Sequence, residues 1–102
     1  MSAIFFLELI AIQGCSAADY TAEVRRCVTS QLHGRQVANR AERMVVSARC
    51  ESAIRHWALA STKQAYGPAF DQNDSTVREE YYARKSVIPL VLMPLDGDPT
   101  HH

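Results

Sequence analysis

Two cysteines constrain the fold of this chain most strongly, because each lies in a segment with the pattern of an amphipathic helix. Cys27 belongs to an apolar stripe that begins at Tyr20 and reaches Leu32, and Gly34 then provides a helix stop. Cys50 lies in a second helical pattern, and a polar segment separates the two. A disulfide between them would clamp a helical hairpin and close a loop of about 24 residues.

The second helical pattern extends from about Arg40 to about Ala65. A capping box that starts at Asn39 favours a helix beginning there, and Gly67 favours its end. The apolar positions before Val46 cluster on one side of this helix, whereas the later ones lie on nearly the opposite side. Either different elements cover the helix on its two faces, or the helix breaks near Val46 and Ser47.

The remaining sequence predicts a short third helix and an apolar tail. A further capping box at Thr76 starts a helix that should end at about Ser86. Two prolines interrupt the apolar segment 87–95, so we expect it to be extended and to lie over the hairpin or on a partner. Residues 96–102 should be disordered. The predicted fold is therefore all-α: a disulfide-clamped helical hairpin, a short third helix and an extended apolar C-terminal tail, in one domain from 19 to 95.

Composition explains why a cross-link would matter in this chain. It has 102 residues, which is the size of a single domain, and alanine supplies much of its apolar content. Because alanine buries little surface, the core should be thin and should gain from a covalent link. Acidic and basic residues balance at eleven each, so net charge indicates neither a nucleic acid nor a membrane partner.

The first 18 residues have several features of a signal peptide. Residues 3–12 are almost continuously apolar, which is too short for a bilayer span but fits the apolar region of a leader. Cleavage after Ala18 would remove Cys15; alternatively, Cys15 could be lipidated as in bacterial lipoproteins. Either event leaves one cysteine pair. Against a leader, no Lys or Arg precedes the apolar run and Glu8 interrupts it, so residues 3–12 could instead be core of a cytosolic protein.

The sequence contains no recognisable catalytic or metal-binding constellation. Cys27, Cys50 and His56 lack the closely spaced cysteine pairs of structural zinc sites. A cysteine nucleophile would need a free thiol and an orienting third group. There is also no glycine-rich phosphate loop and no distinct acid/base pair. We therefore expect a non-enzymatic protein with no catalytic residue, no metal and no cofactor.

The segment from Arg25 to Arg55 is locally basic, with seven arginines and two glutamates. Such a face is usually just solvated, but it could also bind an anionic surface such as phospholipid, lipopolysaccharide or nucleic acid. The candidate residues for this contact are Arg35, Arg40, Arg43, Arg49 and Arg55.

An alternative function is that of a cytosolic DNA-binding protein. Residues 41–47 are similar to the first helix and turn of a bacterial helix-turn-helix domain, in which Ser47 would cap the recognition helix. Two positions depart from this family: Val45 stands where glycine is usual, and Glu51 stands where an aliphatic residue is buried. Nucleic acid is therefore not our leading expectation for a partner. The residues that could reach DNA would be Arg49, Ser52, Arg55 and His56.

In its cysteine pair and alanine-rich helices, over roughly residues 20–60, the chain resembles small uncharacterised secreted or periplasmic proteins of Gram-negative bacteria that carry one cysteine pair on a helical hairpin. This resemblance implies a compartment and a fold class, and no activity. The leading hypothesis is a periplasmic or secreted helical protein without a transmembrane span, which acts by contact with a protein or with the cell envelope.

Overall fold

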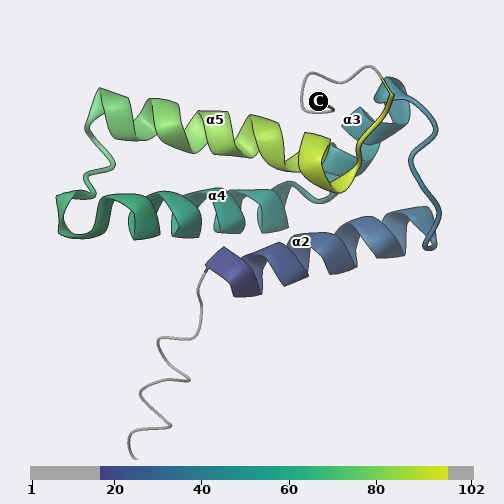
Figure 1. Cartoon of the computed structure of the whole chain (residues 1–102), viewed down its shortest axis with the longest axis horizontal. Helices are drawn as coiled ribbons and strands as arrows, with labels where there is room; N and C mark the ends of the chain where they lie inside the picture. Colours follow the sequence, from purple (N-terminus) through teal and green to yellow (C-terminus); the bar gives the residue numbers. More distant parts are fainter. Residues whose placement is uncertain (1–16, 97–102) are drawn as a thin grey trace, which may run out of the picture.

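The computed structural model describes residues 17–96, and every regular element in this range is helical (Figure 1). The predicted all-α class is therefore confirmed. The elements are α2 (Ala17–Leu32), α3 (Arg40–Arg49), α4 (Glu51–Tyr66), the short 3₁₀ helix η1 (Gly67–Ala69) and α5 (Ser75–Leu92). The predicted leader up to residue 16, with Cys15, and the predicted tail from residue 97 lie outside the described residues.

Helix α4 is the central element of the arrangement. It packs on α2 along one side and on α5 along the other, and it runs antiparallel to both (Figure 1). The short helix α3 lies at the end where α2 finishes and α4 begins. Consecutive helices are thus neighbours in space, as short connections require.

Side chains next to each helix determine where α3 and α5 begin. The Asn39 side chain accepts a hydrogen bond from the Glu42 backbone N–H at 2.8 Å, which confirms the predicted cap of α3. The Glu42 carboxylate accepts from the Ala38 N–H at 2.7 Å. Helix α5 begins at Ser75, slightly earlier than predicted, because Asp74 caps it by accepting from the N–H groups of Thr76 and Val77.

Helix α2 ends as the sequence predicts, at a left-handed turn. His33 and Gly34 have φ values of 53° and 80°, and the Gly34 N–H donates to the Thr29 carbonyl at 3.1 Å. This bond satisfies a carbonyl that the helix end would otherwise leave without a partner.

The predicted second helix is divided into two at Cys50. The Cys50 N–H still donates to the Val46 carbonyl at 2.9 Å, and the Cys50 carbonyl accepts from the Ile54 N–H at 3.0 Å. The backbone of Cys50 is nevertheless not helical (φ −104°, ψ 18°). The break therefore lies a few residues after the position near Val46 and Ser47 suggested by the change of apolar face. The break allows Val46 of α3 and Ile54 of α4 both to be buried.

The third helix is longer than predicted. Helix α5 has 18 residues and continues through Pro89 to Leu92, so residues 87–92 are not extended. Pro89 lies close to the C-terminal end, where a proline removes one backbone hydrogen bond without interrupting a long helix. Burial of Ile88 and Met93 on either side of it offsets that loss. The second proline, Pro94, follows the helix end.

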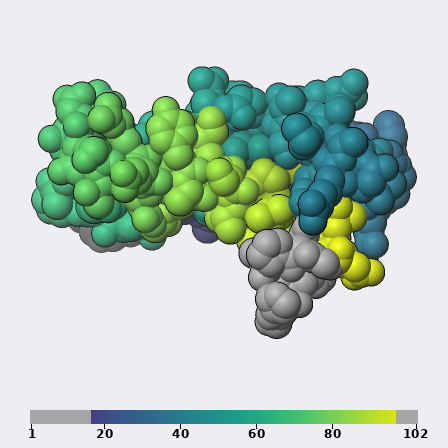
Figure 2. Space-filling view, turned by 90° about the horizontal axis from the view of Figure 1, so that it is seen from above, coloured from purple at the N-terminus to yellow at the C-terminus, as the bar shows by residue number. Residues whose placement is uncertain are grey.

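The hydrophobic core lies at the end of the molecule that contains the disulfide. Helices α2, α3, α4 and α5 all contribute to it, together with Val37 from the loop before α3. The buried members are Val24, Val28, Leu32, Val37, Val46, Cys50, Ala53, Ile54, Ile88 and Met93. The opposite end, which we call the distal end, consists of the second half of α4, η1 and the first half of α5. Figure 2 shows the two ends well separated along the molecule.

Candidate contact surface

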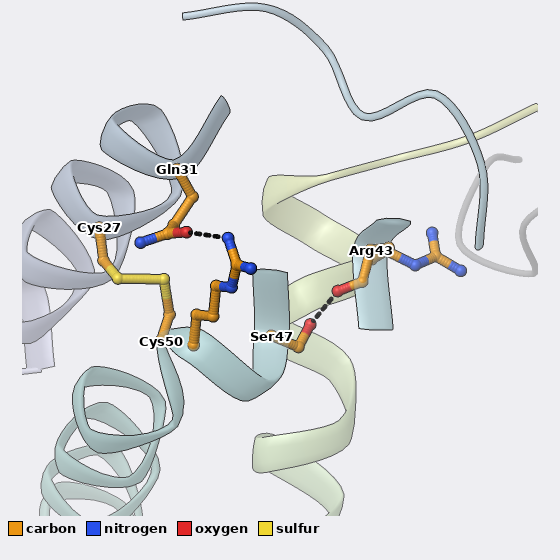
Figure 3. Close-up of a disulfide and its surroundings, with 6 residues drawn as sticks. Cys27, Gln31, Arg43, Ser47 and Cys50 are labelled. Atoms are coloured by element: carbon orange, nitrogen blue, oxygen red, sulfur yellow. Dashed lines mark hydrogen bonds between the residues drawn. A yellow bond between two sulfur atoms is a disulfide. The ribbon is translucent and has the colours of Figure 1, made fainter. Parts of the chain in front are cut away.

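Cys27 and Cys50 form the disulfide that their spacing predicts (Figure 3). Their Cα atoms are 5.9 Å apart, within the range that a disulfide spans without distortion. Cys50 is buried in the core, and Cys27 is partly exposed on α2. The bond joins α2 to the junction between α3 and α4. Disulfides of this kind are characteristic of oxidising compartments outside the cytoplasm, so the pair indicates an extracytoplasmic location.

Beside the disulfide, polar contacts support the position of α3. The Arg49 guanidinium donates to the side-chain oxygen of Gln31 on α2 at 3.2 Å (Figure 3). The Ser47 hydroxyl donates to the Arg43 carbonyl at 2.7 Å, within the same helix. These contacts place Arg49 at the surface close to α2.

Arg43 was expected at an anionic contact surface, and the structure instead buries it, with 9% of its area exposed. Its guanidinium donates to the Met93 carbonyl at 3.1 Å, at the C-terminal end of α5. A cation is favourable at this position, because the helix dipole and the last carbonyls carry partial negative charge there. Arg43 therefore ties α3 to α5 and is not available to a partner.

Arg35 and Glu42 form a two-bond ion pair at the surface. Arg35 Nη1 donates to Glu42 Oε1 at 2.9 Å, and Nη2 contacts Oε2. The hydrogen bonds from Arg35 and from the Ala38 N–H lower the pKa of Glu42 to about 2. This pair fixes the loop before α3 to the first turn of that helix.

The last two candidate arginines, Arg40 and Arg55, are both exposed but lie on different helices. Arg55 is 4.0 Å from Glu51, which also receives a hydrogen bond from Lys85 at 2.7 Å. Arg40, at the start of α3, makes no ion pair with any of the residues 17–96. The five predicted arginines are therefore not one cluster, and Arg35, Arg40 and Arg49 are the exposed ones at α3.

The outward face of α3 is apolar, which the sequence interpretation missed. Met44 is 72% exposed and Val45 is 49% exposed, and Ala41 and Ala48 are exposed beside them. These positions recur at intervals of three and four residues, so they form one stripe on the helix. The sequence showed an apolar cluster here, but neither interpretation of it, a helix covered on two faces or a break near Val46 and Ser47, predicted an exposed stripe. We call Ala41, Met44, Val45 and Ala48 the α3 stripe.

Charge is distributed unevenly between the two ends. Residues 35–49, which include α3, carry four arginines and one glutamate, for a net charge of +3. Residues 71–80, at the distal end, carry four acidic residues and one arginine, for a net charge of −3. The α3 stripe therefore lies at the positive end of a molecule with no net charge.

The turn that the helix-turn-helix interpretation requires is absent from this region. Residues 45–47 are within α3, and Ser47 donates to the carbonyl four residues earlier rather than capping a new helix. A single residue, Cys50, separates α3 from α4, where a helix-turn-helix has a turn of three or four residues. Nucleic-acid binding by another route stays an untested prediction.

A second exposed surface lies at the distal end, between α4 and α5. It is an open groove of about 260 Å³ lined by Leu59, Phe70, Gln72, Val77, Arg78, Tyr81 and Tyr82. The two tyrosine rings contact each other edge to face, with centroids 5.1 Å apart. Lys63 lies 5.6 Å from the centre of the Phe70 ring. The aromatic side chains of the groove thus contact one another or a neighbouring lysine. This packing explains their positions without a bound ligand.

Other chemistry is limited among residues 17–96. No three His, Cys, Asp or Glu side chains in this range come together as metal ligands. Both cysteines of the range are in the disulfide, so neither is a free nucleophile. His56 contacts Glu23 at 3.4 Å, and its ring lies tilted against the Tyr20 ring, with the ring centroids 5.6 Å apart. Within the same range, no helix has the length and hydropathy needed to cross a bilayer.

Comparisons with protein-family models, with curated proteins and with solved structures found no match to this chain. The α3 stripe and its arginines are therefore interpreted from their own geometry.

Proposed function

We propose that this protein is exported to the periplasm or secreted, that residues 3–12 direct its export, and that it acts there without catalysis by binding a component of the cell envelope through α3. The disulfide supports an oxidising compartment. The exposure of the α3 stripe supports binding, and it is the observation that carries the proposal.

The stripe supports a contact function because the packing of α3 is the reverse of the usual pattern. A surface helix normally buries its apolar face and exposes its charges. Here Arg43 is buried, while Met44 and Val45 face outward. The disulfide, Arg43 and the pair formed by Arg35 and Glu42 all hold α3 in this orientation. A fixed helix with exposed apolar side chains is suited to binding rather than to chemistry.

Two measurements on cells that naturally make the protein test this proposal. Intact mass, with thiol alkylation before and after reduction, should give a shortened or lipidated chain whose two remaining thiols appear only on reduction. A photo-crosslinking side chain at position 44 should form adducts in intact cells, whereas the same group at the exposed position Glu79 on α5 should not. A full-length chain with three free thiols would reject export. Equal adduct formation at both positions, or none at 44, would reject the α3 contact.

A further inference from the structure

We infer that the component bound by α3 is the surface of an anionic phospholipid bilayer, on which the helix lies in the membrane plane. This inference rests on the proposed function, because it names the partner of the same surface. It follows from the placement of apolar and charged side chains around α3, from the charge distribution of the whole molecule, and from the size of the stripe.

The side chains of α3 are arranged around its axis as in a helix at a membrane interface. At about 100° per residue, the α3 stripe covers about 100° of the circumference and is centred opposite the buried residues Arg43 and Val46. Arg40 borders the stripe on one side and Arg49 borders it on the other. Interfacial helices have this order, with apolar side chains at the boundary of headgroups and acyl chains and cations beside them.

The bordering arginines are well placed to contact lipid phosphates. Both are exposed, and their long side chains can lie along an apolar surface while the guanidinium stays among the headgroups. Glu42 lies on the same border as Arg49, but the two-bond pair with Arg35 compensates its charge. Arg40 and Arg49 are therefore presented without an uncompensated acid beside them.

The charge distribution would also orient the protein on such a surface. The acidic segment 71–80 lies at the distal end, away from α3 (Figure 2). An anionic membrane attracts the end that carries the stripe and repels the other, so the protein would approach with α3 first.

The stripe fits a bilayer better than it fits a second copy of the chain. A ten-residue helix is about 15 Å long, and its face offers far less than the roughly 800 Å² per partner that a stable dimer buries. Pairing the stripe with itself would also place Arg40 and Arg49 of both copies around the edge of one small interface, where their like charges repel. A bilayer needs no complementary shape, and it accepts two small anchors such as Met44 and Val45.

Co-sedimentation with vesicles tests the inference on the purified, disulfide-bonded protein. We expect binding to phosphatidylcholine vesicles that contain about one third phosphatidylglycerol, weaker binding at higher ionic strength, and little binding to phosphatidylcholine alone. The double variant Met44→Ser/Val45→Ser should weaken binding about tenfold or more. Arg40→Gln and Arg49→Gln should each weaken it about fivefold at low salt.

Matched variants at the other end control for general effects. Leu59→Ser removes an exposed aliphatic side chain, and Arg78→Gln removes an exposed arginine, both beside the distal groove. Neither should reduce binding to anionic vesicles. Circular dichroism should show all variants folded, because every changed side chain is at the surface.

A direct reporter checks that α3 itself enters the interface. In a Trp57→Phe background, the indole introduced by Met44→Trp should be quenched by brominated phosphatidylglycerol. An indole introduced by Tyr82→Trp in the same background should not be quenched, because Tyr82 is exposed at the distal end.

Several results would overturn the lipid assignment. These are no binding to anionic vesicles, binding that ignores Met44→Ser/Val45→Ser, equal loss with Leu59→Ser, or tighter retention on duplex DNA than on vesicles. In the crosslinking experiment, adducts from position 44 to residues 1–16, to a second copy or to another protein would also overturn it. Adducts to another envelope protein would leave the proposed function standing, whereas an absence of adducts would remove both.

Discussion

The two halves of α4 pack in different ways. The first half buries Ala53 and Ile54 among the valines and leucine of α2, next to the disulfide. From Ala58 onward, α4 buries the small side chains of Ala58, Ser61 and Thr62, and Val77 is the buried aliphatic residue of α5 at that end. Large aliphatic side chains and the covalent link thus stabilise one end, whereas mostly small side chains are buried at the other. The two halves of a single helix can therefore differ in local stability.

This difference should appear in local stability. Regions with few buried apolar contacts open at lower free energy than the core does. Amide hydrogens of Thr62 to Tyr66 and of Ser75 to Tyr82 should therefore exchange faster than those of Val24 to Leu32. Substitutions at both ends test this difference in stability.

Removing the disulfide should have the largest effect. By chain entropy, the bond between Cys27 and Cys50 contributes about 3.5 kcal/mol to the free energy of unfolding. Cys27→Ser should therefore lower Tm by about 15 °C or more for a domain of this size, measured by circular dichroism. The control is Cys15→Ser, which removes the same atom without touching the bond. A Cys27→Ser protein with the parent Tm would show that the core alone holds this end.

The same truncation at two buried valines compares the ends directly. Val24 lies in the main core with 1% exposed, whereas Val77 is buried at the distal end with 4% exposed. We expect Val24→Ala to lower the free energy of unfolding by about 2.5 kcal/mol and Val77→Ala by about 1.5 kcal/mol, because the distal end can relax around the lost methyl groups. Urea unfolding measures both. An equal loss at the two sites would remove the contrast.

A polar-to-apolar change at the distal end should have a smaller effect. Thr62 is fully buried, and its hydroxyl donates to the Ala58 carbonyl at 2.7 Å within α4. Because that carbonyl is also part of the helix ladder, Thr62→Val leaves no polar atom without a partner and should change the free energy of unfolding by less than about 1 kcal/mol. A larger loss in urea unfolding would show that this hydroxyl helps to hold α4 on α5.

The smallest effect should come from the exposed pair beside α3. Arg35 and the Ala38 N–H lower the pKa of Glu42 to about 2, from an ordinary value of 4.5. The folded state therefore binds this proton less readily than the unfolded state does. The contribution of the pair to stability should be complete above pH 4.5 and be lost as the pH falls through about 2.

Comparing the parent protein with Glu42→Gln isolates that contribution. The Tm of the parent should exceed that of the variant between pH 5 and 7, and the two should converge near pH 2. Because the pair is at the surface, the difference should also shrink in high salt. A difference in Tm that persists at pH 2 would contradict the assignment to this carboxylate.

Local sequence signals were sufficient to predict much of the fold. The caps at Asn39 and Gly34 act on their own neighbours, and the disulfide follows from two cysteines on converging helices. The exact position of the break, at Cys50 rather than near Val46 and Ser47, and the continuation of α5 through Pro89 were not predicted, because each depends on tertiary packing. Propensity alone favours a continuous helix at Cys50 and an extended segment around Pro89. The burial of neighbouring apolar side chains favours a break at the first site and a helix at the second.

The contact surface was harder to predict than the fold. Sequence reasoning selected arginines by local charge, which does not distinguish a buried cation such as Arg43 from an exposed one such as Arg40. It also considered only a covered helix or a broken one for the apolar cluster that includes Met44, and neither predicted that this cluster is exposed. The change of apolar face near Val46 was the available signal, because a helix covered on one side only can bury just one of two opposite apolar faces.

The position of Cys50 has a consequence for the chain before the disulfide forms. No glycine or proline lies between Arg40 and Tyr66, so nothing local prevents one straight helical rod about 40 Å long. An isolated peptide of these residues should adopt that rod, and the oxidised protein holds it bent at Cys50. Reduction would then free α3 to move: as the helix straightened, α3 would swing away from Met93 and would carry the α3 stripe and its arginines away from the core.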